Sequence, residues 1–127
     1  MRQVIDDMLA AGWGRVINMS SINGQKGQFG QANYSAAKAG MHGFTKAVAQ
    51  ETAAKGITVN TISPGYIGTE MVMAIKQEVR DQIVSGIPVG RLGKPEEIAK
   101  LVSYLASDDA AFITGANIAI NGGQHMC

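Results

Sequence analysis

Tyr34 and Lys38 are the residues whose types and spacing point most directly to chemistry. They stand four apart in Tyr34-Ser35-Ala36-Ala37-Lys38, near the start of an alanine-rich segment, 33–55, whose composition predicts a helix. Residues four apart on a helix share a face, so the two side chains would point at one place. A phenol is a weak acid with a reference pKa of about 10, and a neighbouring ammonium favours its ionised form. The pair therefore predicts a phenol that acts as a general acid or base.

A predicted strand before this pair supplies a third polar group. Residues 15–20 predict a short strand around Val16, Ile17 and Met19, Ser21 follows it, and a glycine-rich loop at 22–33 leads into the predicted helix. Ligands of parallel α/β sheets sit at the carboxyl ends of the strands, so Ser21 and the pair would meet at that edge. Taken alone, Tyr34 and Lys38 fit a packed tyrosine beside a solvated lysine better than a catalytic pair, because such spacings are common on helices.

The spacing of these three residues resembles that of a known enzyme family. Tyr34 follows Ser21 by thirteen residues and Lys38 follows Tyr34 by four, which is similar to the catalytic set of the short-chain dehydrogenase/reductase family. Within that family, the runs 23–35, 40–45 and 63–67 most resemble those of acetoacetyl-CoA reductases. The resemblance extends over residues 3–126 and corresponds to the second half of the family's usual domain.

The resemblance implies hydride transfer from NADPH, or NADH, to a ketone. Tyr34 would donate a proton, Ser21 would hydrogen-bond the carbonyl oxygen, and Lys38 would favour the ionised phenol and hold ribose hydroxyls. The cofactor-binding residues that it implies are Tyr34, Lys38, Pro64, Gly65, Ile67 and Thr69. The substrate-binding residues that it implies are Ser21, Gln28, Gln31 and Tyr66, with Phe29 narrowing the pocket. The alternative interpretation of Gln28 and Gln31 is a pair of amides at the rim of the loop, and that of Tyr66 is a ring packed in a turn. Thr69 would also cap a helix.

Composition limits the other classes of function. The net charge of +1 leaves no electrostatic footprint for nucleic acid or for an anionic membrane. No apolar run approaches the ~18 residues of a membrane span, and the first residues do not resemble a signal peptide. The single cysteine, Cys127, forms no disulfide framework, and His42 and His125 are too isolated for a metal site. We therefore expect a cytoplasmic protein without a metal.

The order of predicted elements indicates an α/β fold. It runs helix end (4–11), strand (15–20), helix (33–55), strand (57–62), helix (69–85), helix (94–106) and strand (117–120). This alternation predicts a parallel sheet with right-handed crossovers. With the resemblance, it predicts one partial domain, 1–127, which is the C-terminal half of a Rossmann-like doubly wound sheet. The glycines at 24, 27 and 30 are spaced too widely for a dinucleotide fingerprint, and no Gly-x-x-x-Gly-x-Gly follows a strand.

Two classes of function stay open at this point. The first is a reductase that converts acetoacetyl-CoA to 3-hydroxybutyryl-CoA, a polyhydroxyalkanoate precursor, or else a 3-oxoacyl-acyl-carrier-protein reductase of fatty-acid synthesis. The chain by itself would then be an inactive fragment. The second is a non-catalytic remnant that folds through oligomer contacts. A homo-oligomer is expected in either case, and a stripe of small residues would pack on the sheet or on a second subunit: Ala36, Gly40, Gly43 and Ala47.

Overall fold

The computed structural model describes residues 1–27 and 29–126, apart from the side chains of Gln25 and Lys26. These residues form one parallel sheet of three strands, β1 (Gly14–Met19), β2 (Ile57–Pro64) and β3 (Asn117–Ile120), with β2 in the centre. In the register, Gly14 is opposite Ile57 and Thr61 is opposite Asn117. The predicted α/β class and its parallel sheet are confirmed.

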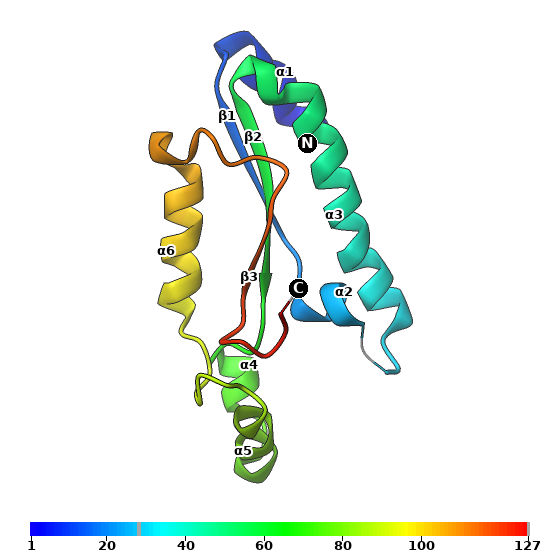
Figure 1. Ribbon diagram of the computed structural model, residues 1–127, viewed down its shortest axis with the longest axis vertical. Coiled ribbons are helices and arrows are strands. Elements are labelled where there is room, and N and C mark those ends of the chain that lie inside the picture. Colours follow the sequence, from blue (N-terminus) through cyan, green and yellow to red (C-terminus); the bar gives the residue numbers. More distant parts are fainter. Residues whose placement is uncertain (28, 127) are drawn as a thin grey trace.

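Helices cover both faces of this sheet. Figure 1 shows α3 (Ala32–Thr52) along one face and α6 (Pro95–Ala106) along the other, with α1 (Arg2–Ala11) beside the end of α3. Single turns of 3-10 helix follow α3 and α6, at Ala53–Lys55 and Asp108–Ala110. Among the described residues, no helix combines the length and the apolar character that a membrane span needs.

Each face of the sheet has its own apolar core. On the α3 side, Ile57 and Val59 are fully buried against Ala49, and side chains of α1 complete the cluster. On the α6 side, Ile62 packs with Leu105. Alternate residues of a strand point to opposite faces, which explains why neighbouring positions of β2 enter different cores.

The face of the sheet beneath α3 changes character along the strands. At the amino ends it presents Val16, Ile57 and Val59. Toward the carboxyl ends the same face presents hydroxyl and amide side chains, namely Asn18, Ser20, Thr61, Ser63 and Asn117. Residues of α3 satisfy them; Thr45, for example, bonds Thr61 at 2.7 Å and Asn18 at 2.9 Å. Buried polar groups need such partners because leaving them unpaired costs free energy.

Two predicted elements are corrected by the structure. The stretch 22–33, predicted as a loop, contains a short helix, α2 (Ile22–Lys26), because Ser21 caps it and its backbone packs against α3. The helix predicted over 69–85 is divided into α4 (Glu70–Met73) and α5 (Gln77–Ser85) by the extended backbone of Lys76. Neither half buries a residue fully, and short helices without packing are marginal in water.

Strand β2 also runs further than predicted. The predicted strand ended at residue 62, but Ser63 and Pro64 also belong to it and pair with Ala119 and Ile120 of β3. Pro64 is the last residue of this central strand, so the N–H that it lacks interrupts no later part of the ladder. The chain therefore leaves the sheet at Gly65, at the same edge where β1 ends.

Candidate functional site

Tyr34 and Lys38 meet on the exposed side of the first turns of α3. The ammonium of Lys38 lies over the ring of Tyr34, 5.6 Å from the ring centroid. Tyr34 is 46% exposed, so its phenol is open to a ligand. The shared face that the four-residue spacing predicted is present. A cation over an aromatic ring is attracted by the electron-rich face of that ring.

Both the side chain and the backbone of Lys38 are hydrogen-bonded to residues at the end of β1. Its ammonium donates to the carbonyl oxygen of Met19 at 3.3 Å, and its own carbonyl accepts from the hydroxyl of Ser20 at 3.0 Å. An ammonium has three N–H donors, and the bond to Met19 uses one. Within the described part of the chain, no second protein acceptor bonds this ammonium, so it has donors for the hydroxyls of a ligand.

Ser21 lies at the junction between β1 and α2. Its hydroxyl oxygen accepts from the N–H of Asn23 at 3.2 Å and so caps α2. A hydroxyl accepts through its lone pairs and still has its own proton to donate. Ser21 therefore caps α2 and keeps its own hydroxyl proton for a second hydrogen bond. The cap is a second function that the sequence interpretation did not include.

The residues expected at the cofactor lie where β2 leaves the sheet. Pro64 ends the strand, and the N–H of Gly65 donates to Ile120 at 3.0 Å. Ile67 runs beside Gly93 in an isolated parallel bridge. Thr69 caps α4 by accepting from Val72 at 3.4 Å, which is the structural role foreseen for it. These four residues follow β2 in an ordered segment at the carboxyl edge of the sheet.

The residues expected at the substrate are not gathered into one pocket. Gln31 and Tyr34 line a shallow depression at the start of α3, whereas Tyr66 lines a different pocket. The side-chain oxygen of Gln31 accepts from Asn23 at 3.0 Å. Gln28 lies outside the described residues. Phe29 is 99% exposed and packs on no other part of the described chain, so its place at a substrate pocket stays a prediction.

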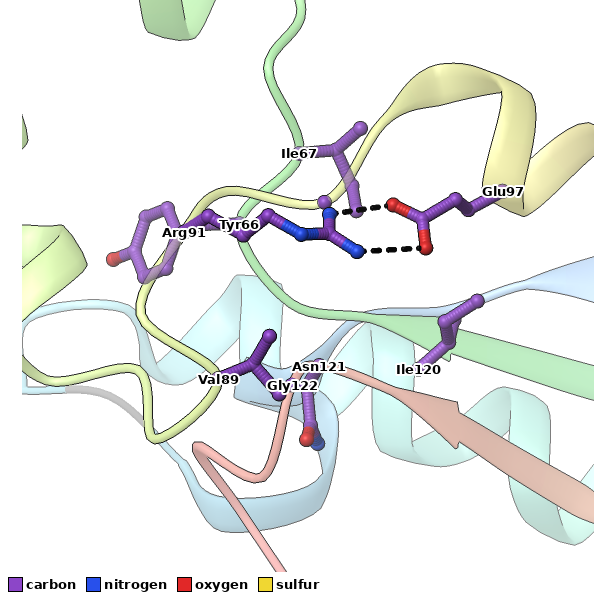
Figure 2. Close-up of a pocket in the computed structure, with 9 residues that line it drawn as sticks. Tyr66, Ile67, Val89, Arg91, Glu97, Ile120, Asn121 and Gly122 are labelled. Atoms are coloured by element: carbon purple, nitrogen blue, oxygen red, sulfur yellow. Dashed lines mark hydrogen bonds and ion pairs between the residues drawn. The ribbon is translucent and has the colours of Figure 1, made fainter.

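The pocket at Tyr66 has a volume of about 130 Å³ and lies past the ends of β2 and β3. Figure 2 shows Arg91 and Glu97 pointing toward one another across it, with Val89, Ile120 and Asn121 on the other side. The guanidinium donates to both carboxylate oxygens, at 2.7 and 3.2 Å. Such a bidentate pair fixes the orientation of both side chains.

Glu97 also organises the start of α6. The same carboxylate accepts from the backbone N–H of Lys94 at 2.9 Å. The hydrogen bond from Arg91, reinforced by that from Lys94, lowers the pKa of Glu97 to about 2. Sequence analysis predicted this helix over 94–106 but did not identify Arg91 as a partner of Glu97. The pairing depends on the turn between them and could not be read from helical spacing.

Comparison with known proteins shows which family this chain belongs to. A family model described as enoyl-(acyl carrier protein) reductase matches residues 1–125. The acetoacetyl-CoA reductase of Cupriavidus necator is 64% identical over 125 residues, which are 98% of this chain and 51% of that protein. The chain belongs to the short-chain dehydrogenase/reductase family.

Other short-chain dehydrogenases/reductases also match most of this chain. The acetoacetyl-CoA reductase of Shinella zoogloeoides is 70% identical over 113 residues, which are 88% of this chain and 47% of that protein. The 3-oxoacyl-acyl-carrier-protein reductase of Pseudomonas aeruginosa is 49% identical over 125 residues, or 98% of this chain and 51% of its own length. The chain thus spans about half the length of the curated relatives that it matches.

Proposed function

We propose that this chain forms the catalytic and substrate-binding half of an enzyme that reduces acetoacetyl-CoA to 3-hydroxybutyryl-CoA with NADPH. The observation that supports this most is the placement of Tyr34 and Lys38 on one exposed face of α3, tied through Lys38 to the end of β1. The 64% identity with the Cupriavidus necator acetoacetyl-CoA reductase favours this substrate over other ketones. NADH is the alternative cofactor.

The exposed groups of this edge suit a nicotinamide cofactor. The ammonium of Lys38 has donors beyond its bond to Met19, and ribose hydroxyls are acceptors that it would hold. The segment Pro64–Gly65, Ile67 and Thr69 would border the nicotinamide side. When bound, the reduced nicotinamide would supply the hydride, and Tyr34, Ser21 and Lys38 are the side chains of this chain that we assign to the ketone.

Tyr34 provides the proton that the reduction requires. As the ketone oxygen gains negative charge, the phenol gives its proton to that oxygen and leaves an alcohol. Ser21 donates a hydrogen bond to the same oxygen and stabilises the developing charge. The ammonium of Lys38, close to the ring of Tyr34, stabilises the phenolate that remains.

Binding of the acyl group is assigned to Gln28, Gln31 and Tyr66. The amide nitrogen of Gln31 is a donor for a thioester or ketone oxygen, since its bond from Asn23 uses only the side-chain oxygen. Tyr66 approaches from the end of the next strand. One extra methylene is discriminated by only about 1–3 kcal/mol in an apolar pocket, so we expect modest activity on five-carbon analogues.

The experiment compares two thioesters of the same acyl group on the natural gene product that contains residues 1–127. We expect kcat/KM to be higher for acetoacetyl-CoA than for the acetoacetyl thioester of acyl-carrier protein. Gln28→Ala and Tyr66→Phe should raise KM or lower kcat for acetoacetyl-CoA. Tyr104→Phe is the matched control, since Tyr104 lies on α6.

A preference for the carrier-protein thioester would support the second candidate, a 3-oxoacyl-acyl-carrier-protein reductase. The 49% identity with the Pseudomonas aeruginosa enzyme is the observation that keeps this candidate. Absence of reduction of either thioester, with cofactor bound, would contradict both and favour a non-catalytic role. Analytical ultracentrifugation of the same protein would test the expected homo-oligomer.

A further inference from the structure

His42 lies at the centre of a chain of hydrogen bonds beneath the first turns of α3. Its Nε2 is 3.1 Å from the hydroxyl oxygen of Ser20 and 3.4 Å from that of Ser63. Ser20 directly follows β1 and precedes Ser21, and Ser63 lies near the end of β2. One imidazole therefore bridges the ends of two neighbouring strands and the helix that carries Tyr34.

The direction of these bonds follows from counting hydroxyl protons. Ser20 gives its only hydroxyl proton to the carbonyl oxygen of Lys38, at 3.0 Å, and a carbonyl oxygen can only accept. The oxygen of Ser20 can then only accept from His42. Ser63 likewise gives its proton to the side-chain oxygen of Asn117, at 2.7 Å. Both serines need a donor, and Nε2 must carry the proton that is shared between them.

We infer that His42 is a positioning residue, whose Nε2–H holds Ser20 and Ser63 and so fixes the main chain at Lys38. This inference deepens the proposed reductase function and rests on it for its catalytic consequence. The connection runs from His42 to Ser20, from Ser20 to the carbonyl of Lys38, and from the same turn to the ammonium over Tyr34. His42 touches none of the reacting atoms assigned above.

The surroundings of His42 keep it suited to this role. Burial, and to a smaller extent the charge of Lys46, lower the pKa of the imidazole. The neutral ring then carries one proton, which the two serines place on Nε2, and Nδ1 is left bare. Ser20 is only 8% exposed and Ser63 is fully buried, so water does not replace the imidazole as their donor without opening the helix.

A histidine that only filled space between α3 and the sheet would not need a proton on Nε2. A leucine of similar volume would fill the space between α3 and the sheet, but it would leave both serine oxygens without a donor. A glutamine extends an amide N–H to about the place of Nε2 and would restore it. The two substitutions therefore separate the filling of volume from the donation of a hydrogen bond.

The first test reads the tautomer directly and does not depend on activity. It uses the natural gene product that contains residues 1–127, with 15N-labelled histidine, in mildly alkaline solution where the ring is neutral. We expect two-bond proton–nitrogen correlations of His42 to show a protonated Nε2 and an unprotonated Nδ1. Loss of these signals in His42→Gln assigns them to His42. A His42 ring protonated at Nδ1 alone, or exchanging freely between the two forms, would overturn the inference.

The second test compares kcat for three variants of the same protein. Misplacing a catalytic group by about 1 Å costs up to about 10²-fold, so we expect His42→Leu to lower kcat by about 10- to 10²-fold. We expect His42→Gln to recover to within about 3-fold of the parent and His125→Gln to match it. Equal losses for the leucine and glutamine variants would contradict the positioning role.

The two tests fail independently. A parent protein that reduces neither thioester would contradict the proposed function and leave the tautomer measurement to decide the hydrogen-bond assignment. Should His42→Leu not fold, the glutamine variant still decides the question, because a folded His42→Gln protein with kcat as low as that of Tyr34→Phe would overturn the inference.

Discussion

Gly24 lies against Lys38 so closely that a Cβ atom on Gly24 would stand 2.7 Å from the Cβ of Lys38 and 3.0 Å from the hydroxyl oxygen of Ser20. Real Cβ atoms essentially never come this near to another heavy atom. The close contact lets the backbone of α2 pack directly on the turn of α3 that carries the lysine. Helix α2 thereby connects the serine that caps it, Ser21, with the helix that carries Tyr34.

The first prediction concerns Gly24→Ala. Alanine in place of glycine within a helix ordinarily stabilises by about 0.5–1 kcal/mol. Here the added methyl meets Lys38, and overpacking typically costs about 1–3 kcal/mol, so the clash outweighs the gain. We expect a lower free energy of unfolding in urea and a lower kcat, because Lys38 must shift.

Gly86→Ala is the matched control for this variant. Gly86 follows α5 with an ordinary negative φ, and its added Cβ would make only a normal contact, 3.5 Å from the carbonyl oxygen of Ile83. We expect little change in stability or turnover for the control. A Gly24→Ala protein as stable and as active as the parent would show that α2 can move away from Lys38 at no cost.

The second prediction concerns the proposed proton donor. Tyr34→Phe keeps the ring beneath Lys38 but removes the hydroxyl, and general acid catalysis is typically worth about 10²–10⁴-fold. We expect a loss of kcat in that range for the natural gene product that contains residues 1–127, with cofactor affinity largely kept. Lys38→Ala should weaken cofactor binding as well as turnover. Near-normal turnover of Tyr34→Phe, beside an unaffected Tyr104→Phe control, would refute the assignment.

The third prediction concerns the ion pair of Arg91 and Glu97. The hydrogen bond from Arg91 lowers the pKa of Glu97 from an ordinary 4.5 to about 2. A lowered folded-state pKa means that the carboxylate stabilises the fold above pH 4.5 and that this stabilisation is lost as the pH falls toward 2. The contribution is therefore complete at neutral pH and declines only in acid.

An NMR titration of the Glu97 side-chain carboxyl carbon would measure this directly. We expect a midpoint near 2 in the parent and a higher midpoint in Arg91→Gln, because the main cause of the shift is removed. Arg80→Gln is the control, since Arg80 lies on α5 and contacts Met73 instead. An unchanged midpoint in Arg91→Gln would mean that the backbone of Lys94 alone holds the carboxylate ionised.

The fourth prediction concerns the chain of 127 residues by itself. It contains no strand followed by Gly-x-x-x-Gly-x-Gly, the kind of loop whose N–H groups cradle a dinucleotide phosphate. We expect isothermal titration calorimetry to show weak binding of NADPH or none. Tight binding at one site per chain would contradict both this expectation and the view that these residues are one half of a larger domain.

The sequence predicted the parallel sheet and the Tyr34–Lys38 face because both depend on local periodicity. The alternation of strand and helix, and a spacing of four residues on one helix, are visible without knowing what packs on what. Helix α2 was missed because its stability comes from contact with Lys38, and glycine there argues against a helix by propensity.

The hydrogen-bond chain through His42 was equally invisible. His42 stands 22 residues from Ser20 and 21 residues from Ser63 in the sequence. Sequence analysis considered His42 only as a possible metal ligand and set it aside because no other ligand stood at a suitable spacing. Only the register of β1 against β2, which brings Met19 opposite Ile62, places the two serines beneath one imidazole.

The division of the α3-facing side of the sheet into an apolar and a polar half has a consequence for how this chain can vary. Apolar contacts at Val16, Ile57 and Val59 have no direction, so side chains of similar volume can replace one another there. The polar half, at Ser20, Thr61 and Ser63, is held by hydrogen bonds. Each of these bonds needs a donor opposite an acceptor at the right distance. We therefore expect substitutions at the amino ends of the strands to change the stability of the fold little. Substitutions at the carboxyl ends should lower it more, even at positions that do not contact a ligand.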